Sequence, residues 1–177
     1  MSISHLSLVN QKLAYASALV ALLNTSNYAP ESGSRLQQQA LGDAAVFHMA
    51  TALHFYLREL ADHHHIKNLS AIHSIQDLAA VLQQADRASS ESSELLSLVQ
   101  AKDTWLNQLT LYYNQLSRSP EKPKEKKAFV HENLIELVEL TDAEELPSLH
   151  LTPELLTEWL DSFRALIIRQ RETSAEY

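Results

Sequence analysis

The chain has 177 residues, of which 45 % are hydrophobic and 20 % are charged, and its formal net charge is −8 at pH 7. It contains no cysteine, which excludes a disulfide framework, a thiolate metal site and a cysteine nucleophile. Phosphate groups repel such a charge, so nucleic-acid binding is not expected without a local basic patch. With only two glycines and five prolines, the composition favours helices over hairpin-rich sheets.

A first helix is predicted over residues 4–24. Apolar residues recur there at steps of three and four, which places them on one stripe of a helix: Leu6, Val9, Leu13, Ala16, Val20 and Leu23. Leu8, Leu19 and Leu22 widen this stripe and predict a well-buried helix. No positive charge precedes an apolar core, and no run approaches 18 apolar residues. We therefore expect neither a signal peptide nor a transmembrane helix.

A second helix is predicted over residues 34–63, with a core stripe of Val46, Met49, Leu53, Tyr56 and Leu60. Gly42 lies inside it and costs up to about 1 kcal/mol relative to alanine. Either a close helix crossing or a merely tolerated glycine accounts for that residue.

Three further helices follow in the chain. Ser74 and Asp77 predict the start of a short helix that ends near residue 86, because a hydroxyl caps the first turn and an acid meets the helix dipole. Apolar spacing predicts a single helix over residues 91–117. The sequence Thr152-Pro153-Glu154 predicts the start of the last helix. Residues 118–127 carry five basic and two acidic residues, a local charge of +3, and read as a solvated linker that could touch phosphate or an acidic partner.

Apolar stripes on long helices must be buried against one another. The sequence therefore predicts an all-α fold, an antiparallel up-and-down bundle of four long helices plus one or two short helices. We expect one domain over residues 1–177, within which residues 118–150 form a connector and an irregular excursion.

Two stretches carry a family resemblance: Phe47-His48 followed by residues 56–61 (YLRELA), and residues 159–166 (WLDSFRAL) followed by residues 169–172 (RQRE). Together they resemble an uncharacterised family of small all-helical proteins found mainly in gamma-proteobacteria. The resemblance implies an all-α fold and a bacterial cytoplasmic setting, and it transfers no catalytic residue.

Arg58 and His63 are similar to the Arg-x4–6-His signature of HEPN ribonucleases, which are helical bundles. The resemblance implies that the two side chains would position and activate the 2′-hydroxyl and phosphate of RNA without a metal. Glu59 departs from the neutral or small polar residue usual after the arginine, and the pair closes the second helix instead of opening the last. Five helical residues also separate the two side chains by about 140° around the axis. The alternative is a pair of surface residues near a helix end.

Nine histidines are present, and three of them, His63 to His65, are consecutive. Glu59 and His63 are four residues apart, a usable spacing for metal ligands, which makes Glu59, His63 and His65 the candidates for a metal site. Consecutive helical residues point about 100° apart, so the three histidines converge only if the helix has ended. The alternative is a helix C-terminus whose histidines meet the negative end of the dipole.

His48 and His54 lie in the middle of the second helix, and His54 could share a polar seam with Arg58 and Asp62. Either histidine is catalytic only if an orienting acid and a pocket accompany it, and a buried structural histidine is the alternative.

No motif in the chain requires chemistry, so we favour a non-enzymatic interaction or scaffold protein in the cytoplasm, without a cofactor. The alternatives are a metal-independent ribonuclease using Arg58 and His63, and a histidine-ligated metal protein. A protein partner or a second copy of the chain could cover Leu41 and Phe55, which lie off the predicted core stripe. No membrane association is expected.

Overall fold

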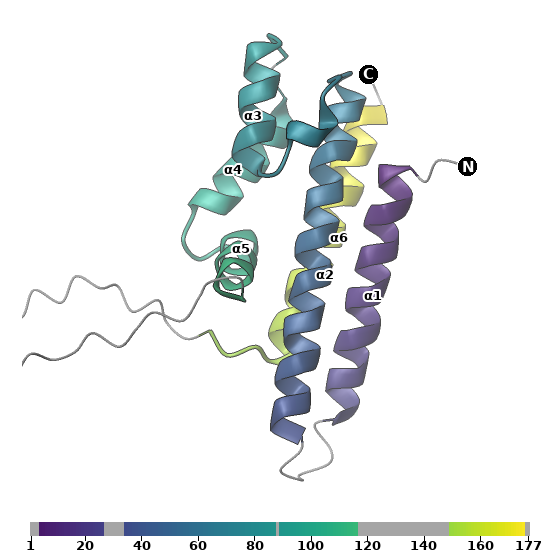
Figure 1. The fold of residues 1–177 in the computed structure, drawn as a ribbon, viewed down its shortest axis with the longest axis vertical. Coiled ribbons are helices and arrows are strands. Elements are labelled where there is room, and N and C mark those ends of the chain that lie inside the picture. Colours follow the sequence, from purple (N-terminus) through teal and green to yellow (C-terminus); the bar gives the residue numbers. More distant parts are fainter. Residues whose placement is uncertain (1–3, 27–33, 88, 117–148, 176–177) are drawn as a thin grey trace, which may run out of the picture.

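The structure is a computed structural model, and it describes residues 4–26, 34–87, 89–116 and 149–175. Its helices are α1 (His5–Ser26), α2 (Ser34–His63), the short 3-10 turn η1 (Leu69–Ala71), α3 (Ile75–Gln84), α4 (Ser90–Gln100), α5 (Trp105–Leu116) and α6 (Pro153–Ala175) (Figure 1). The described part of the chain contains no strand, which confirms the all-helical prediction. The predicted linker at 118–127 and the excursion up to residue 148 lie outside the described residues.

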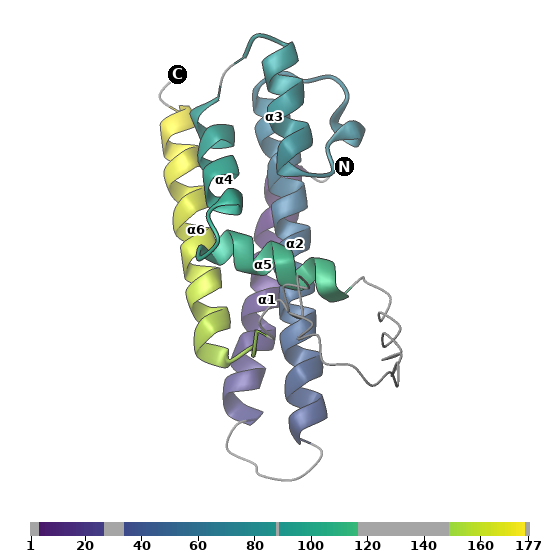
Figure 2. The same cartoon turned by 90° about the vertical axis from the view of Figure 1, so that its left-hand side faces the viewer.

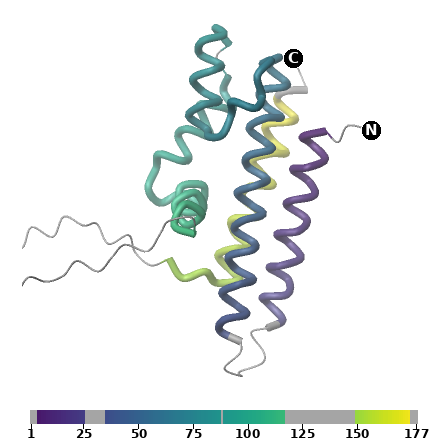
Figure 3. The backbone as a smooth tube through the Cα atoms, in the orientation of Figure 1, coloured from purple at the N-terminus to yellow at the C-terminus, as the bar shows by residue number. Residues whose placement is uncertain are grey.

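Three long helices, α1, α2 and α6, lie side by side (Figure 3). α1 runs antiparallel to α2 and packs along most of its length, whereas α6 runs in the same direction as α2 (Figure 1). This arrangement differs from the predicted bundle of four long helices that alternate in direction. The difference arises at the fourth helix, because the single helix predicted over 91–117 is two helices, α4 and α5, and α5 lies across α2 (Figure 2).

Side-chain hydrogen bonds stabilise the break between α4 and α5. The Thr104 hydroxyl donates to the carbonyls of Leu98 and Ala101, the latter at 3.0 Å, and it accepts from the Asn107 backbone N–H at 3.3 Å. The Asn107 amide donates to the Val99 carbonyl at 2.6 Å. Carbonyls at the end of a helix have no partner within it, so these contacts replace the bonds that a continued helix would have made.

The core confirms most of the predicted stripes. All five predicted core residues of α2 are buried, and so are five of the six in α1: Val9, Leu13, Ala16, Val20 and Leu23. The prediction is wrong for Leu6 and Leu22, whose side chains are 46 % and 54 % exposed. Of the residues that widened the stripe, Leu8 and Leu19 are half-buried, and Leu19 packs against the core.

By length and composition alone, α1 is apolar enough over His5–Thr25 to cross a membrane, so the expectation of no transmembrane helix stays a prediction. A helix from the core of a soluble protein and a signal sequence both meet the same criterion of length and composition. In the structure, one face of α1 packs against α2 and α6.

Gly42 marks a close approach between α2 and the segment that leads into α6. A Cβ atom built on Gly42 would lie 3.2 Å from Cδ1 of Leu151, which is tighter than an ordinary van der Waals contact. The tight contact is with a residue that precedes α6, and Leu156 of α6 itself lies at an ordinary 3.9 Å, so the close helix crossing stays a prediction.

Candidate ligand-binding cavity

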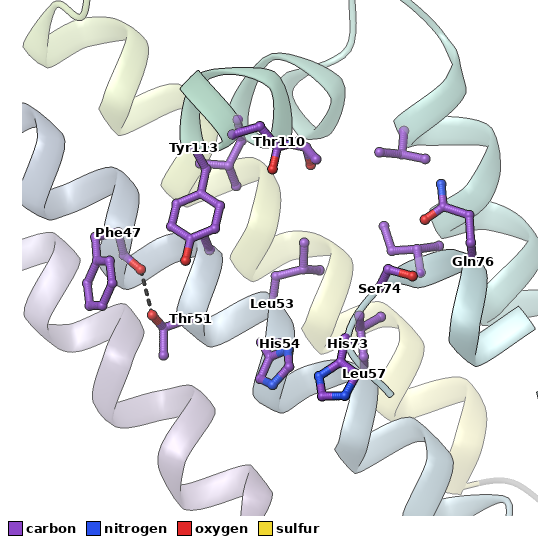
Figure 4. Close-up of a pocket in the computed structure, with 15 residues that line it drawn as sticks. Phe47, Thr51, Leu53, His54, Leu57, His73, Ser74, Gln76, Thr110 and Tyr113 are labelled. Atoms are coloured by element: carbon purple, nitrogen blue, oxygen red, sulfur yellow. Dashed lines mark hydrogen bonds between the residues drawn. The ribbon is translucent and has the colours of Figure 1, made fainter. Parts of the chain in front are cut away.

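A cavity of about 560 Å³ lies where α5 crosses α2. α2 forms its floor, α5 lies above it, and the chain from His73 to Gln76 closes one side (Figure 4). Sites for small molecules usually measure about 300–1,000 Å³, and this cavity falls within that range.

The walls of the cavity are largely apolar. Side chains from α2, α3, α4 and α5 meet there, chiefly Leu53, Leu57, Ile75, Val99 and Leu109. The rings of Phe47 and Tyr113 lie at one end, with centroids 6.3 Å apart (Figure 4). Phe47 is 49 % exposed, which places an apolar ring at the rim.

Two histidines lie at the other end of the cavity. The ring of His54, from α2, stacks on that of His73, with centroids 6.1 Å apart and planes inclined by 23° (Figure 4). Burial lowers the pKa of His54, and the positive charge of Arg58 lowers it further, while a hydrogen bond to the backbone of His73 opposes both effects. His54 is therefore a neutral imidazole near pH 7, with one nitrogen that donates and one that accepts.

The start of α3 fixes the backbone of His73. The Ser74 hydroxyl accepts from the Asp77 N–H at 3.1 Å, and the Asp77 carboxylate accepts from the His73 N–H at 3.1 Å. A hydrogen bond from the Ser74 side chain and then the backbone N–H of His73 lower the pKa of the Asp77 carboxyl. The cap predicted from Ser74 and Asp77 is confirmed, and its consequence is that His73 is held beside the cavity.

The structure places Arg58 beside His54 and places His63 at the end of α2. Arg58 is half-buried, and its Nε atom is buried without a hydrogen-bond partner. His63 is exposed, and its ring lies 5.5 Å from that of His64. Because α2 is continuous between Arg58 and His63, their side chains leave its axis about 140° apart, and the two do not share one face.

The metal candidates also lie apart. Both carboxylate oxygens of Glu59 bind Arg171, at 2.7 and 2.9 Å. His65 follows the end of α2 with a φ of 54° and is exposed. Among the described residues, no group of three histidine or acidic side chains is placed to hold a metal ion.

His48 lies outside the cavity and faces α1. Its ring makes an edge contact with Tyr15 of α1, with centroids 5.4 Å apart, and its Nδ1 atom is buried without a hydrogen-bond partner. Burial, and then the charge of Lys12, lower the pKa of His48. Its position favours the structural interpretation of this residue.

Sequence reasoning did not assign His73 and Tyr113 to a site with His54. These residues belong to three separate elements, and no local spacing links them. The cap at Ser74 was the one available signal, because it fixed where the chain turns into α3 beside His73.

The residues that the structure describes form an all-helical fold with a largely apolar cavity of small-molecule size beside a histidine pair. The chain belongs to a protein family of unknown function, DUF6586, whose family model matches residues 1–177. No curated protein and no solved structure matches the chain. The resemblance to an uncharacterised family is thereby confirmed, while the bacterial origin and the likeness to HEPN ribonucleases stay predictions.

Proposed function

We propose that this protein is a non-enzymatic cytoplasmic binding protein whose ligand occupies the cavity between α2, α3 and α5. The observation that carries the proposal is the cavity itself, with its largely apolar walls and a histidine pair at one end. Ligand sites in proteins combine these two properties. The net charge of −8 and the absence of cysteine fit a soluble protein in a reducing compartment.

A neutral apolar probe tests the cavity without assuming the natural ligand. N-phenyl-1-naphthylamine fluoresces strongly only when it leaves water, and its size suits the cavity. Ligands of this size gain about 0.3 kcal/mol per non-hydrogen atom, or about 5 kcal/mol in total, so we expect a Kd on the order of 200 µM.

Thr110 of α5 lines the cavity, and Thr110→Trp fills part of it. We expect this variant to weaken probe binding at least about tenfold, because an indole displaces the ligand. Ala80 of α3 is exposed and does not line the cavity, so Ala80→Trp is the matched control and should bind like wild type. Equal binding by all three folded proteins would overturn the proposal.

A metal-independent ribonuclease, predicted from Arg58 and His63, is the second candidate. The observation that favours it is the contact of two imidazoles, His54 and His73, beside Arg58, because such a pair can supply a general base and a general acid. This candidate comes second because the net charge of −8 repels the phosphate backbone of RNA.

The ribonuclease test is degradation of single-stranded RNA in the presence of a metal chelator. Cleavage lost in His63→Ala supports the helix-end pair, and cleavage lost in His54→Gln supports the cavity pair. No cleavage by the wild-type protein rejects this candidate.

A further inference from the structure

The polar end of the cavity narrows the class of ligand. Resting on the binding function proposed above, we propose that the cavity binds a monocarboxylic acid with an apolar body, whose carboxylate lies at His54 and His73 and whose apolar part extends toward Phe47 and Tyr113.

Charge complementarity carries the first step. The residues that line the cavity include no aspartate, glutamate, lysine or arginine, and their ionisable side chains are His54, His73 and Tyr113. A carboxylate placed there meets no like charge in the lining, although the whole chain carries −8. An imidazole can donate an N–H to an oxygen, and it becomes a better donor once an anion draws a proton to it.

The charged groups beside His54 and His73 also favour a negatively charged ligand. Arg58 is close enough to lower the pKa of His54, so a positive potential reaches this end of the cavity. The carboxylate of Asp77 is engaged by the backbone N–H of His73 and by hydrogen bonds from the side chain and backbone of Ser74. A monoanion fits better than a phosphate dianion, because no arginine or lysine in the lining could neutralise a second charge.

The arrangement of the walls carries the second step. The nearly parallel imidazoles lie together at one end, and the two aromatic rings lie at the other, with Leu53 between them (Figure 4). A ligand with one polar end and an apolar remainder matches this division. The hydroxyls of Thr51 and Thr110 also line the cavity, but each donates to a carbonyl of its own helix at 2.7 Å. A molecule that is polar along its whole length would therefore leave groups unpaired against the apolar walls, such as Leu57 and Leu109.

Competition between decanoate and 1-decanol against the bound naphthylamine probe tests the inference, because the two differ only in the head group. For the wild-type protein at pH 7, we expect decanoate to bind at least about tenfold more tightly than decanol, the difference that one charge-assisted contact gives. Lowering the pH from 8 to 6 should strengthen decanoate binding and leave decanol binding unchanged.

The double variant His54→Gln, His73→Gln should lose that preference, measured as the ratio of its decanoate affinity to its decanol affinity. His63→Gln is the matched control, because His63 is exposed at the end of α2 and does not line the cavity. Equal affinity of the wild-type protein for the two ligands overturns the inference, and so does an unchanged preference in the double variant. If the probe binds in the cavity but no carboxylate preference exists, only this inference fails. If the probe does not bind, the proposed function fails as well.

Discussion

Breaking the contact between Glu59 of α2 and Arg171 of α6 is expected to lower the free energy of unfolding by about 2 kcal/mol. The guanidinium group binds both carboxylate oxygens, at 2.7 and 2.9 Å, and the side chains of Arg171 and Glu59 are only 27 % and 17 % exposed. Exposed ion pairs contribute about 0–1 kcal/mol, whereas breaking a fully buried pair costs about 3–5 kcal/mol. A bidentate, partly buried pair falls between these limits.

A double-mutant cycle of Glu59→Gln and Arg171→Met, followed by urea unfolding, measures the coupling. We expect about 1.5–2 kcal/mol, and each single variant should melt about 4–8 °C below wild type. The contact of Arg171 with Asn10, at 3.2 Å, cancels in the cycle.

Asp161 and Arg164 provide the matched control cycle. Their closest charged atoms are 3.6 Å apart, and the side chains of Arg164 and Asp161 are 43 % and 69 % exposed, so the coupling should stay below about 0.5 kcal/mol. If the Glu59–Arg171 coupling were as small as this one, the reasoning from burial and bidentate geometry would be refuted.

Three other changes have defined outcomes. Tyr56→Phe removes a buried 2.7 Å hydrogen bond to Gln170 Oε1 and should cost about 1–2 kcal/mol in urea unfolding, whereas Tyr15→Phe, at an exposed ring, should stay within about 0.5 kcal/mol. Thr104→Ala combined with Asn107→Leu removes the bonds at the α4–α5 break, so helical content by circular dichroism should rise and probe binding should fall. Lowering the pH from about 7.5 to 5.5 should reduce the free energy of unfolding. Burial lowers the pKa of His48, His54 and His64 in the folded protein, so the unfolded chain binds more protons over this range and is favoured as the pH falls. A urea midpoint that stays constant or rises as the pH falls contradicts this reasoning.

Local signals in the sequence predicted most of the elements correctly. The bounds of α2 follow from its apolar spacing and from the polar cluster on each side. The starts of α3 and α6 follow from caps, because a hydroxyl that accepts an N–H within three residues is a property of the local chain. Such signals need no knowledge of what lies across the core.

The direction of the helices and the position of the cavity were not predictable in the same way. Both depend on contacts between residues far apart in the chain, such as the hydrogen bond from Tyr112 of α5 to Asp43 of α2 at 2.8 Å. The candidate site shifted for the same reason. Spacing along α2 offered both His63 and His54 as neighbours of Arg58. The structure places His54 beside Arg58, and it brings His73 to them from another element, which no spacing along α2 could predict.

The break at residues 101–104 explains how the cavity arises. The apolar pattern of the sequence did not predict this break. Leu98 and Trp105 are seven residues apart, two helical turns, so the apolar stripe continues across the break and predicts one straight helix. Such a helix would pack along α2, and its side chains would cover the surface of α2 that the cavity now exposes. Because the chain turns instead at Thr104, α5 crosses α2 (Figure 2). Leu109 and Tyr113 of α5 and Leu53 of α2 line the same cavity at that crossing. The hollow beside the histidine pair therefore depends on a few side-chain hydrogen bonds, each worth about 1 kcal/mol.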